Sequence, residues 1–170
     1  MNKITQSTFG IIGNGRFGKI WSEAIKSHGT VKIFDKKSKT ASMKKLKETL
    51  DCDILFLLVP ISEMEKICKK ISPLLNKKTI VIDACSVKER PAQIMKKWLP
   101  EDQPIIASHP LFGPESTKKI GLKGQKIVCS PIRATKNQIT TFEILIQKIG
   151  LKIIKETPEK HDKEMASSQA

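Results

Sequence analysis

The chain has 170 residues, of which 39% are hydrophobic, and a formal net charge of +14. This length suits one ordinary domain and is short for two, and no apolar run is long enough to span a membrane. Only three of the 31 basic residues are arginines and aromatic residues make up 5%, so the charge indicates a lysine-coated surface and not a nucleic-acid-binding module. We expect a cytoplasmic protein without a metal site, because the N-terminus lacks a signal-peptide pattern and the four cysteines form no zinc-like cluster.

Short apolar runs alternate along the chain with amphipathic stretches. The apolar runs are typical of strands and lie at 8–12, 31–34, 54–59, 79–82, 104–107, 126–129 and 151–154. Apolar residues at helical spacing predict helices over 16–27, 61–71, 87–98 and 136–149. This order predicts an α/β fold, with a Rossmann-type, doubly wound, mostly parallel sheet and helices on both faces.

A glycine-rich loop follows the first apolar run. Gly13, Gly15 and Gly18 form G-x-G-x-x-G between a predicted strand and a predicted helix. The first glycine allows a tight turn, the second lets a pyrophosphate approach the backbone, and the third lets the helix pack on the strand. The loop therefore predicts cofactor binding by Gly13, Asn14, Gly15, Arg16, Phe17 and Gly18.

The second apolar run ends at Asp35, which lies 20 residues beyond Gly15. A dinucleotide-binding fold places an acid here to bind the ribose hydroxyls of the cofactor. The charge of Asp35 opposes a 2′-phosphate and favours NAD, while Lys36 and Lys37 partly offset it and leave NADP as the alternative.

The third and fourth runs end in residues that face the same expected ligand edge. Val59 and Pro60 close the third run and are candidates to line the cofactor, or form a plain turn. Ser86 follows the fourth run, where Glu89 three residues later indicates a helix N-cap and capping box. Its hydroxyl is also expected on the ligand side. Lys88 is either a substrate contact or a surface lysine, and we favour the surface position.

The fifth run leads into His109, in the stretch SHPLFGPES. Because two prolines and a glycine follow, we expect a stiff loop here that neither continues the sheet nor starts a helix. A neutral imidazole suits proton acceptance near neutral pH. The other two histidines, His28 and His161, are expected to be structural.

The glycine loop, Asp83-x-x-Ser86-Val87-Lys88, and His109-Pro110-Leu111-Phe112-Gly113-Pro114 occur in this order. With them, the chain resembles the prephenate/arogenate dehydrogenase family of tyrosine biosynthesis. The later run from Thr157 to Asp162 is similar to the start of that family's helical second domain.

The resemblance implies an oxidative decarboxylation of prephenate or arogenate, in which hydride passes to NAD or NADP and the ring carboxylate leaves as carbon dioxide. It assigns His109 as the catalytic proton acceptor and Ser86 to orienting that histidine or the substrate. It also implies a cofactor domain over 1–157 and a helix over 158–170, which leads to a missing domain that forms a homodimer and completes the substrate site.

Two alternatives remain open at this point. The chain could belong to another NAD(P)-dependent two-domain dehydrogenase that acts on small hydroxy acids, in which case HPLFGP is a coincidence. It could also be a non-catalytic NAD-binding regulatory module, which a longer parent protein with a helical domain would argue against.

Overall fold

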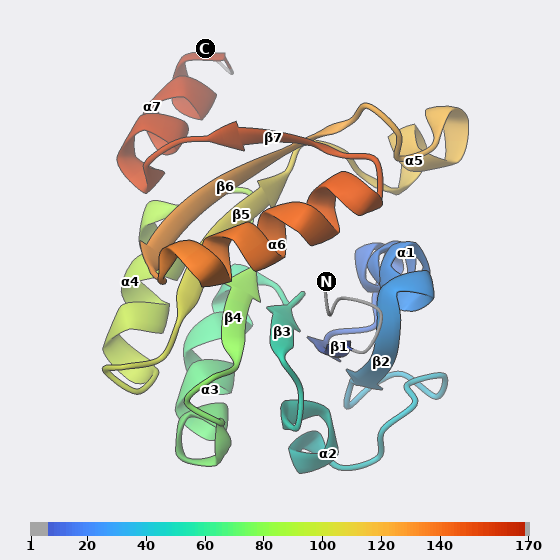
Figure 1. Cartoon of the computed structure of the whole chain (residues 1–170), viewed down its shortest axis with the longest axis vertical. Helices are drawn as coiled ribbons and strands as arrows, with labels where there is room; N and C mark the ends of the chain where they lie inside the picture. Colours follow the sequence, from blue (N-terminus) through green and yellow to red (C-terminus); the bar gives the residue numbers. More distant parts are fainter. Residues whose placement is uncertain (1–6, 169–170) are drawn as a thin grey trace.

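The computed structural model describes residues 7–168 of the chain (Figure 1). Within them, one seven-stranded sheet has the order β2-β1-β3-β4-β5-β6-β7. The strands are β1 (Ser7–Ile12), β2 (Gly29–Phe34), β3 (Ile54–Leu57), β4 (Ile80–Asp83), β5 (Ile105–Pro110), β6 (Lys126–Arg133) and β7 (Lys152–Lys155). The predicted runs therefore all correspond to strands.

The sheet is mostly parallel, as the alternation of strands and helices predicts. Strands β1 to β5 run in one direction, β6 is antiparallel to β5, and β7 is parallel to β6. Parallel neighbours need crossover connections, which helices provide. The helices are α1 (Arg16–Ile25), α2 (Leu46–Leu50), α3 (Ile61–Ile71), α4 (Glu89–Trp98), α5 (Pro114–Ile120), α6 (Lys136–Lys148) and α7 (Pro158–Ser168).

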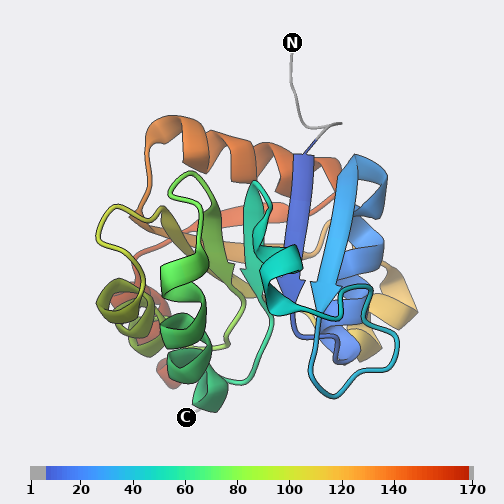
Figure 2. The same ribbon diagram turned by 90° about the horizontal axis from the view of Figure 1, so that it is seen from below.

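Helices cover both faces of the sheet, and each face has its own hydrophobic core. On one face α1 and α6 pack through Trp21 and Phe142 against Phe9 and Phe56. On the other face α3 and α4 pack against the sheet, with residues that include Met64, Cys68, Ile71 and Met95. Figure 2 shows α6 in orange and α3 in green on different sides of the strands. This two-faced arrangement confirms the Rossmann-type fold.

The stretch after the fifth apolar run differs from the prediction of a loop. Strand β5 continues through His109 and Pro110, and helix α5 begins at Pro114. Strand β4 pairs with β5 only as far as Ile106, so the missing N–H of Pro110 breaks no hydrogen bond to β4. Proline is also well suited to the first turn of a helix, where the N–H has no partner within the helix. His109 therefore lies on a strand end, a more rigid position than a loop.

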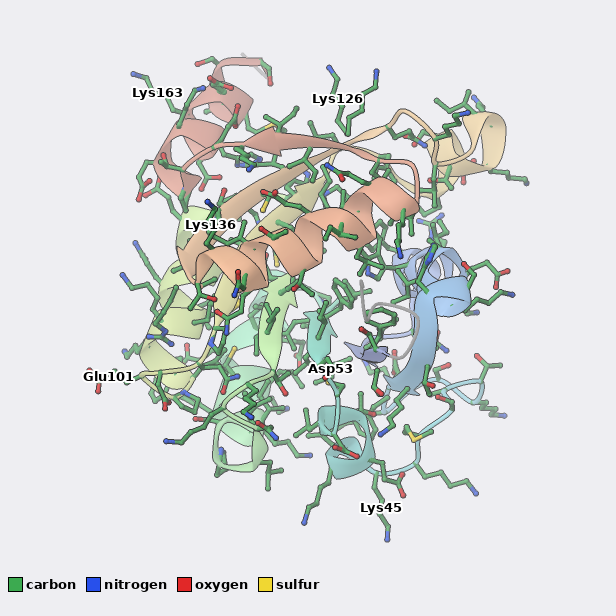
Figure 3. All side chains as sticks on the ribbon, viewed as in Figure 1. Lys45, Asp53, Glu101, Lys126, Lys136 and Lys163 are labelled. Carbon is green, nitrogen blue, oxygen red and sulfur yellow. The ribbon has the colours of Figure 1, made fainter. Side chains whose placement is uncertain are left out.

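The predicted helix over 158–170 is present as α7 up to Ser168, and its last two residues lie outside the described part of the chain. Helix α7 packs near the N-terminal end of α4, which lies more than 70 residues earlier in the sequence (Figure 1). Exposed lysines are spread widely: in Figure 3, Lys45 lies at the bottom of the molecule, while Lys126 and Lys163 lie along its upper part.

Candidate functional site

The five parallel strands end along one edge of the sheet, and the predicted site residues gather there. The chain leaves β1 for β2 on one side and returns to β3 on the other, which makes the β1/β3 boundary a switch point. Ligands of open α/β sheets bind at such a point, outside the carboxyl ends of the strands. The residues that follow or close these ends are Gly13, Asp35, Val59, Pro60, Ser86 and His109.

Each glycine of the loop meets a different geometric need. Gly13 has φ of +111°, and a Cβ there would lie 2.2 Å from the carbonyl oxygen of Leu58. A Cβ on Gly18 would lie 2.3 Å from the carbonyl oxygen of Gly13, so α1 packs closely on the loop. Gly15 has no atom within 4 Å of such a Cβ. The space beside Gly15, at the N-terminus of α1, fits a phosphate group.

Other residues of the loop hold it in place. Asn14 is buried, and its side-chain amide donates to the hydroxyls of Ser38 (2.8 Å) and Thr40 (3.0 Å). Phe17 lies 6.0 Å from Phe112, centroid to centroid, and so joins the glycine loop to the HPLFGP segment. Arg16 is exposed at the start of α1.

The carboxylate of Asp35 closes the loop after β2. One of its oxygens accepts from the N–H of Asn14 (2.7 Å), and the other accepts from the N–H groups of Lys37 (2.7 Å) and Ser38 (3.2 Å). Burial raises the pKa of the Asp35 carboxyl, but these backbone hydrogen bonds outweigh it and hold the pKa below 3.8. Asp35 is therefore a carboxylate at neutral pH, next to the glycine loop.

A hollow of about 620 Å³ adjoins Asp35. It is lined by Phe34, Asp35, Lys36, Ser38, Lys39, Ala41, Met43 and Lys44. The carboxylate suits ribose hydroxyls and the three lysines suit an added phosphate, so the hollow contains groups for either dinucleotide.

His109 pairs with another histidine, and within residues 7–168 no hydrogen bond joins its ring to Ser86. Its Nδ1 lies 2.9 Å from Nε2 of His161, and the two rings meet edge to face at 80° with centroids 5.0 Å apart. Nδ1 of His161 lies 2.7 Å from Oδ1 of Asp162. The side chain of His161 is 1% exposed, as suits the structural role expected for it. It also directly contacts the candidate catalytic ring of His109.

Asp162 also caps helix α4. Its two carboxylate oxygens accept from the backbone N–H groups of Lys88 (2.7 Å) and Glu89 (2.9 Å). The expected capping box of Ser86 and Glu89 is therefore wrong: α4 begins at Glu89, and Ser86 is exposed before it. The carboxylate from α7 takes the position that a serine hydroxyl fills in a local cap.

Burial sets the protonation state of His109. It lowers the pKa of the ring from 6.5 to about 4, with smaller contributions from His161 and Lys88, while the Asp162 carboxylate opposes the shift. Burial also raises the pKa of Asp162, but hydrogen bonds from Glu89, His161 and Lys88 outweigh it and keep that pKa below 3.8. At neutral pH the neutral ring of His109 thus lies near the ionised carboxylate of Asp162.

The expectation that Lys88 is a surface lysine is wrong. Its side chain is fully buried, and Nζ lies 2.6 Å from Oδ2 of Asp83 and also bonds the carbonyl oxygen of Ser108. Asp83 further accepts from the N–H groups of Cys85 (2.9 Å) and Ser108 (3.2 Å). The pair ties the end of β4 to the residue before His109.

Val59 and Pro60 form the turn from β3 into α3. Val59 is half-buried, and Pro60 is exposed at the N-cap position of α3. Among residues 7–168 there is no cluster of three or more metal-ligating side chains, and no helix long and apolar enough to cross a membrane.

Three participants were not identified from the sequence: His161, Asp162 and Asp83. The adjacent residues His161 and Asp162 were the one signal in the sequence, because a histidine beside a carboxylate can form a polar pair. Its partner, His109, lies 52 residues away in the chain, and no local pattern reveals a contact of that range.

A family model described as "Prephenate dehydrogenase, nucleotide-binding domain" matches residues 20–155. A probable arogenate/prephenate dehydrogenase of Methanocaldococcus jannaschii is 31% identical over 119 residues, covering 69% of this chain and 26% of the relative. Arogenate dehydrogenase 1, chloroplastic, of Arabidopsis thaliana is 28% identical over 186 residues, a match that covers 99% of this chain and 29% of the relative. The chain thus spans between a quarter and a third of the length of these two relatives.

A solved structure of prephenate dehydrogenase from A. aeolicus, in complex with hydroxyphenyl propionate and NAD+, is similar in fold. The TM-score is 0.76 at 18% identity, and the match covers 95% of this chain and 63% of that chain. The family match covers most of the sheet and its helices. The chain therefore belongs to the family of prephenate dehydrogenase nucleotide-binding domains.

Proposed function

We propose that this chain is the cofactor-binding part of a prephenate or arogenate dehydrogenase that oxidises and decarboxylates its substrate. The observation that carries the proposal is the contact between Phe17 and Phe112, which brings the glycine loop and the HPLFGP segment together. A dinucleotide held at Gly15 and a substrate held at His109 would then be neighbours.

The residues present fit an NAD-type cofactor. The open space at Gly15 and the amide groups at the start of α1 suit the pyrophosphate, and Asp35 suits the adenosine ribose. Arg16, Val59 and Pro60 are proposed to line the same crevice. The bound cofactor supplies the acceptor for hydride. We propose NAD as the preferred form because Asp35 carries a negative charge where NADP carries a phosphate.

The role of His109 in this proposal is to accept a proton. As hydride leaves the ring carbon, the hydroxyl proton on that carbon passes to a ring nitrogen of neutral His109. The carbon–carbon bond to the ring carboxylate then breaks, carbon dioxide leaves, and the electron pair makes the ring aromatic. Ser86 is exposed near the end of β4 and is proposed to contact substrate.

The domain division is part of the same proposal. Residues 1–157 form the cofactor domain, and α7 begins the helical region that carries further substrate contacts and the contacts of a homodimer. Lys88 is bound to Asp83 and so is not free for a substrate carboxylate. The remaining cations for the substrate are therefore expected from the helical region.

The test is turnover of the complete protein with prephenate or arogenate, each with NAD or NADP. His109→Asn should lower kcat by roughly a hundredfold or more, the scale of a general base, and leave cofactor affinity unchanged. His28→Asn is the matched control, because His28 follows α1 at the far end from the glycine loop. Absent turnover with both substrates, or near-normal turnover of His109→Asn, would contradict the proposal.

A further inference from the structure

Three side chains from two distant parts of the sequence form a continuous hydrogen-bonded line. It runs from His109 on β5 to His161 on α7 and then to Asp162, with spacings of 2.9 and 2.7 Å. His161 is 1% exposed. A buried ring with partners on both nitrogens has a fixed orientation and a fixed tautomer.

The donors and acceptors in this line can be assigned from its far end. Asp162 is ionised and accepts from two backbone N–H groups at the start of α4, so it also accepts from His161. Nδ1 of His161 therefore carries the proton. With a neutral His161 as the premise of the inference, its Nε2 is an acceptor and accepts from Nδ1–H of His109.

The same logic decides the state of the outer nitrogen of His109. With the proton on Nδ1, Nε2 of His109 has a free lone pair. Within residues 7–168 this atom has no hydrogen-bond partner and is not among the buried unpaired atoms, so it is open to solvent. The opposite tautomer would present an N–H, which cannot accept a proton.

We propose that His161 and Asp162 are positioning residues for His109, and that they hold its ring in the Nδ1–H tautomer with Nε2 ready to accept a proton. The inference deepens the dehydrogenase function proposed above and rests on it. In the reaction, the substrate hydroxyl proton bonds to Nε2 while the Nδ1 proton stays on the bond to His161. The resulting positive ring lies next to the His161–Asp162 pair.

The surroundings of His109 agree with a ring that is neutral before reaction. The charged or titratable groups that act on it are His161 and Asp162 on α7 and Lys88 before α4. Nζ of Lys88 lies 2.6 Å from Oδ2 of Asp83, and Lys88 contributes to lowering the pKa of His109. The low pKa of His109, about 4, keeps the ring uncharged near neutral pH.

The experiment is nitrogen-15 NMR of the imidazole rings in the 170-residue chain, without substrate or cofactor. We expect a protonated-type shift at Nδ1 of His109 and an unprotonated-type shift at its Nε2. His161→Leu removes the acceptor and should move His109 toward the Nε2–H tautomer. His161→Gln keeps an acceptor oxygen near the place of Nε2 and should retain the wild-type tautomer.

Asp162 needs a control of its own, because it also caps α4. Asp162→Asn allows His161 to reverse its tautomer, and we expect a larger fraction of Nε2–H at His109. Thr135→Ala removes the cap of α6, where the Thr135 hydroxyl accepts from Gln138 N–H at 3.3 Å. That variant should lose stability without changing the His109 signals.

The proposal is overturned if wild-type His109 carries its proton on Nε2, or if His161→Leu leaves the tautomer unchanged. Should His161→Leu not fold, the wild-type and Asp162→Asn spectra decide. In the complete protein, His161→Leu should lower kcat more than tenfold with little change in KM, and His161→Gln should restore part of it. A protein that turns over neither substrate refutes the proposed function, while the tautomer result stands or falls separately.

Discussion

In the proposed function, the Asp35 carboxylate has two tasks, to hold the glycine loop and to bind a ribose hydroxyl. A carboxylate has about four lone-pair positions, and backbone N–H groups of Asn14, Lys37 and Ser38 occupy three of them. Two of these donors share one oxygen, so the free position lies on the oxygen that binds Asn14. A ribose hydroxyl can bind there without displacing the loop.

We therefore expect wild-type chain to bind NAD more tightly than NADP, and Asp35→Ser to reverse or remove that preference. A hydrogen bond to a charged group contributes about 1.5–3 kcal/mol, so NAD affinity should fall about tenfold or more. Calorimetric titration of both cofactors measures the ratio. Thr40→Ala perturbs the loop through Asn14 without removing charge and should leave the ratio unchanged. Equal affinities in the wild type would contradict the role of Asp35.

The sequence allows Asp35 and His109 to be proposed as site residues, but it does not reveal the buried positions of Lys88 and His161. Asp35 has a fixed distance from the glycine loop, and His109 is part of a recognisable motif. Lys88 is one of 28 lysines, and nothing in its neighbourhood distinguishes a buried lysine from an exposed one. Its partners come from the ends of β4 and β5, and the partner of His109 comes from α7. Only the tertiary fold brings these groups together.

At the scale of elements, the glycine loop and α1 form one unit whose glycines are not equivalent. Gly18 has no room for a methyl group, since a Cβ would meet the backbone of Gly13 at 2.3 Å. Gly15 has room, and its φ of −69° is accessible to any residue. The space at Gly15 is thus not used for packing, and in the proposed function it holds the cofactor phosphates.

This difference predicts opposite effects of two similar substitutions. Gly18→Ala should lower the free energy of unfolding by roughly 1–3 kcal/mol, the cost of overpacking. Gly15→Ala should change stability by no more than about 0.5 kcal/mol but lower NAD affinity at least about tenfold. Urea denaturation and cofactor titration measure the two effects. An unaltered NAD affinity in Gly15→Ala would place the phosphates elsewhere.

Element prediction succeeded where apolar runs and helical spacing were strong, and failed where proline was taken as a terminator. Pro110 closes β5 because its nitrogen lies beyond the pairing with β4, and Pro114 begins α5. The N-cap of α4 could not be predicted from neighbouring residues, since Asp162 supplies it from 73 residues beyond Glu89.

For the whole molecule, His109 makes folding depend on pH. Its pKa is about 4 in the folded chain, against an ordinary value of 6.5. Between these pH values His109 is protonated in the unfolded chain but not in the folded chain. The free energy of unfolding therefore decreases as pH falls through this range. Above about pH 6.5 both states are neutral at this ring and the contribution is constant. Asp35 and Asp162, with lowered pKa values, weaken the fold only at lower pH.

Urea unfolding measured in steps from pH 7 to pH 4 tests this dependence. The wild type should lose stability progressively below about pH 6.5, and His109→Asn should lose less. Asp35→Ser is the control, since its carboxyl titrates below 3.8 and its removal leaves the upper range unchanged. A pH profile of His109→Asn identical to that of the wild type would show that this ring is not the group responsible.

Strand β7 has four residues and ends at Lys155. Lys155 pairs with Cys129 of β6, and Cys129 pairs with Ser108 of β5, so β7 ends level with the residue before His109. Helix α7 starts soon afterwards and so presents His161 at the level of His109. A strand advances about 3.3 Å per residue, which exceeds the 2.9 Å between the two ring nitrogens. One residue inserted into or deleted from β7, with its pairing to β6 kept, would shift the start of α7 by about this distance and separate the rings. The contact between the rings therefore depends on the length of this strand as well as on the histidine itself.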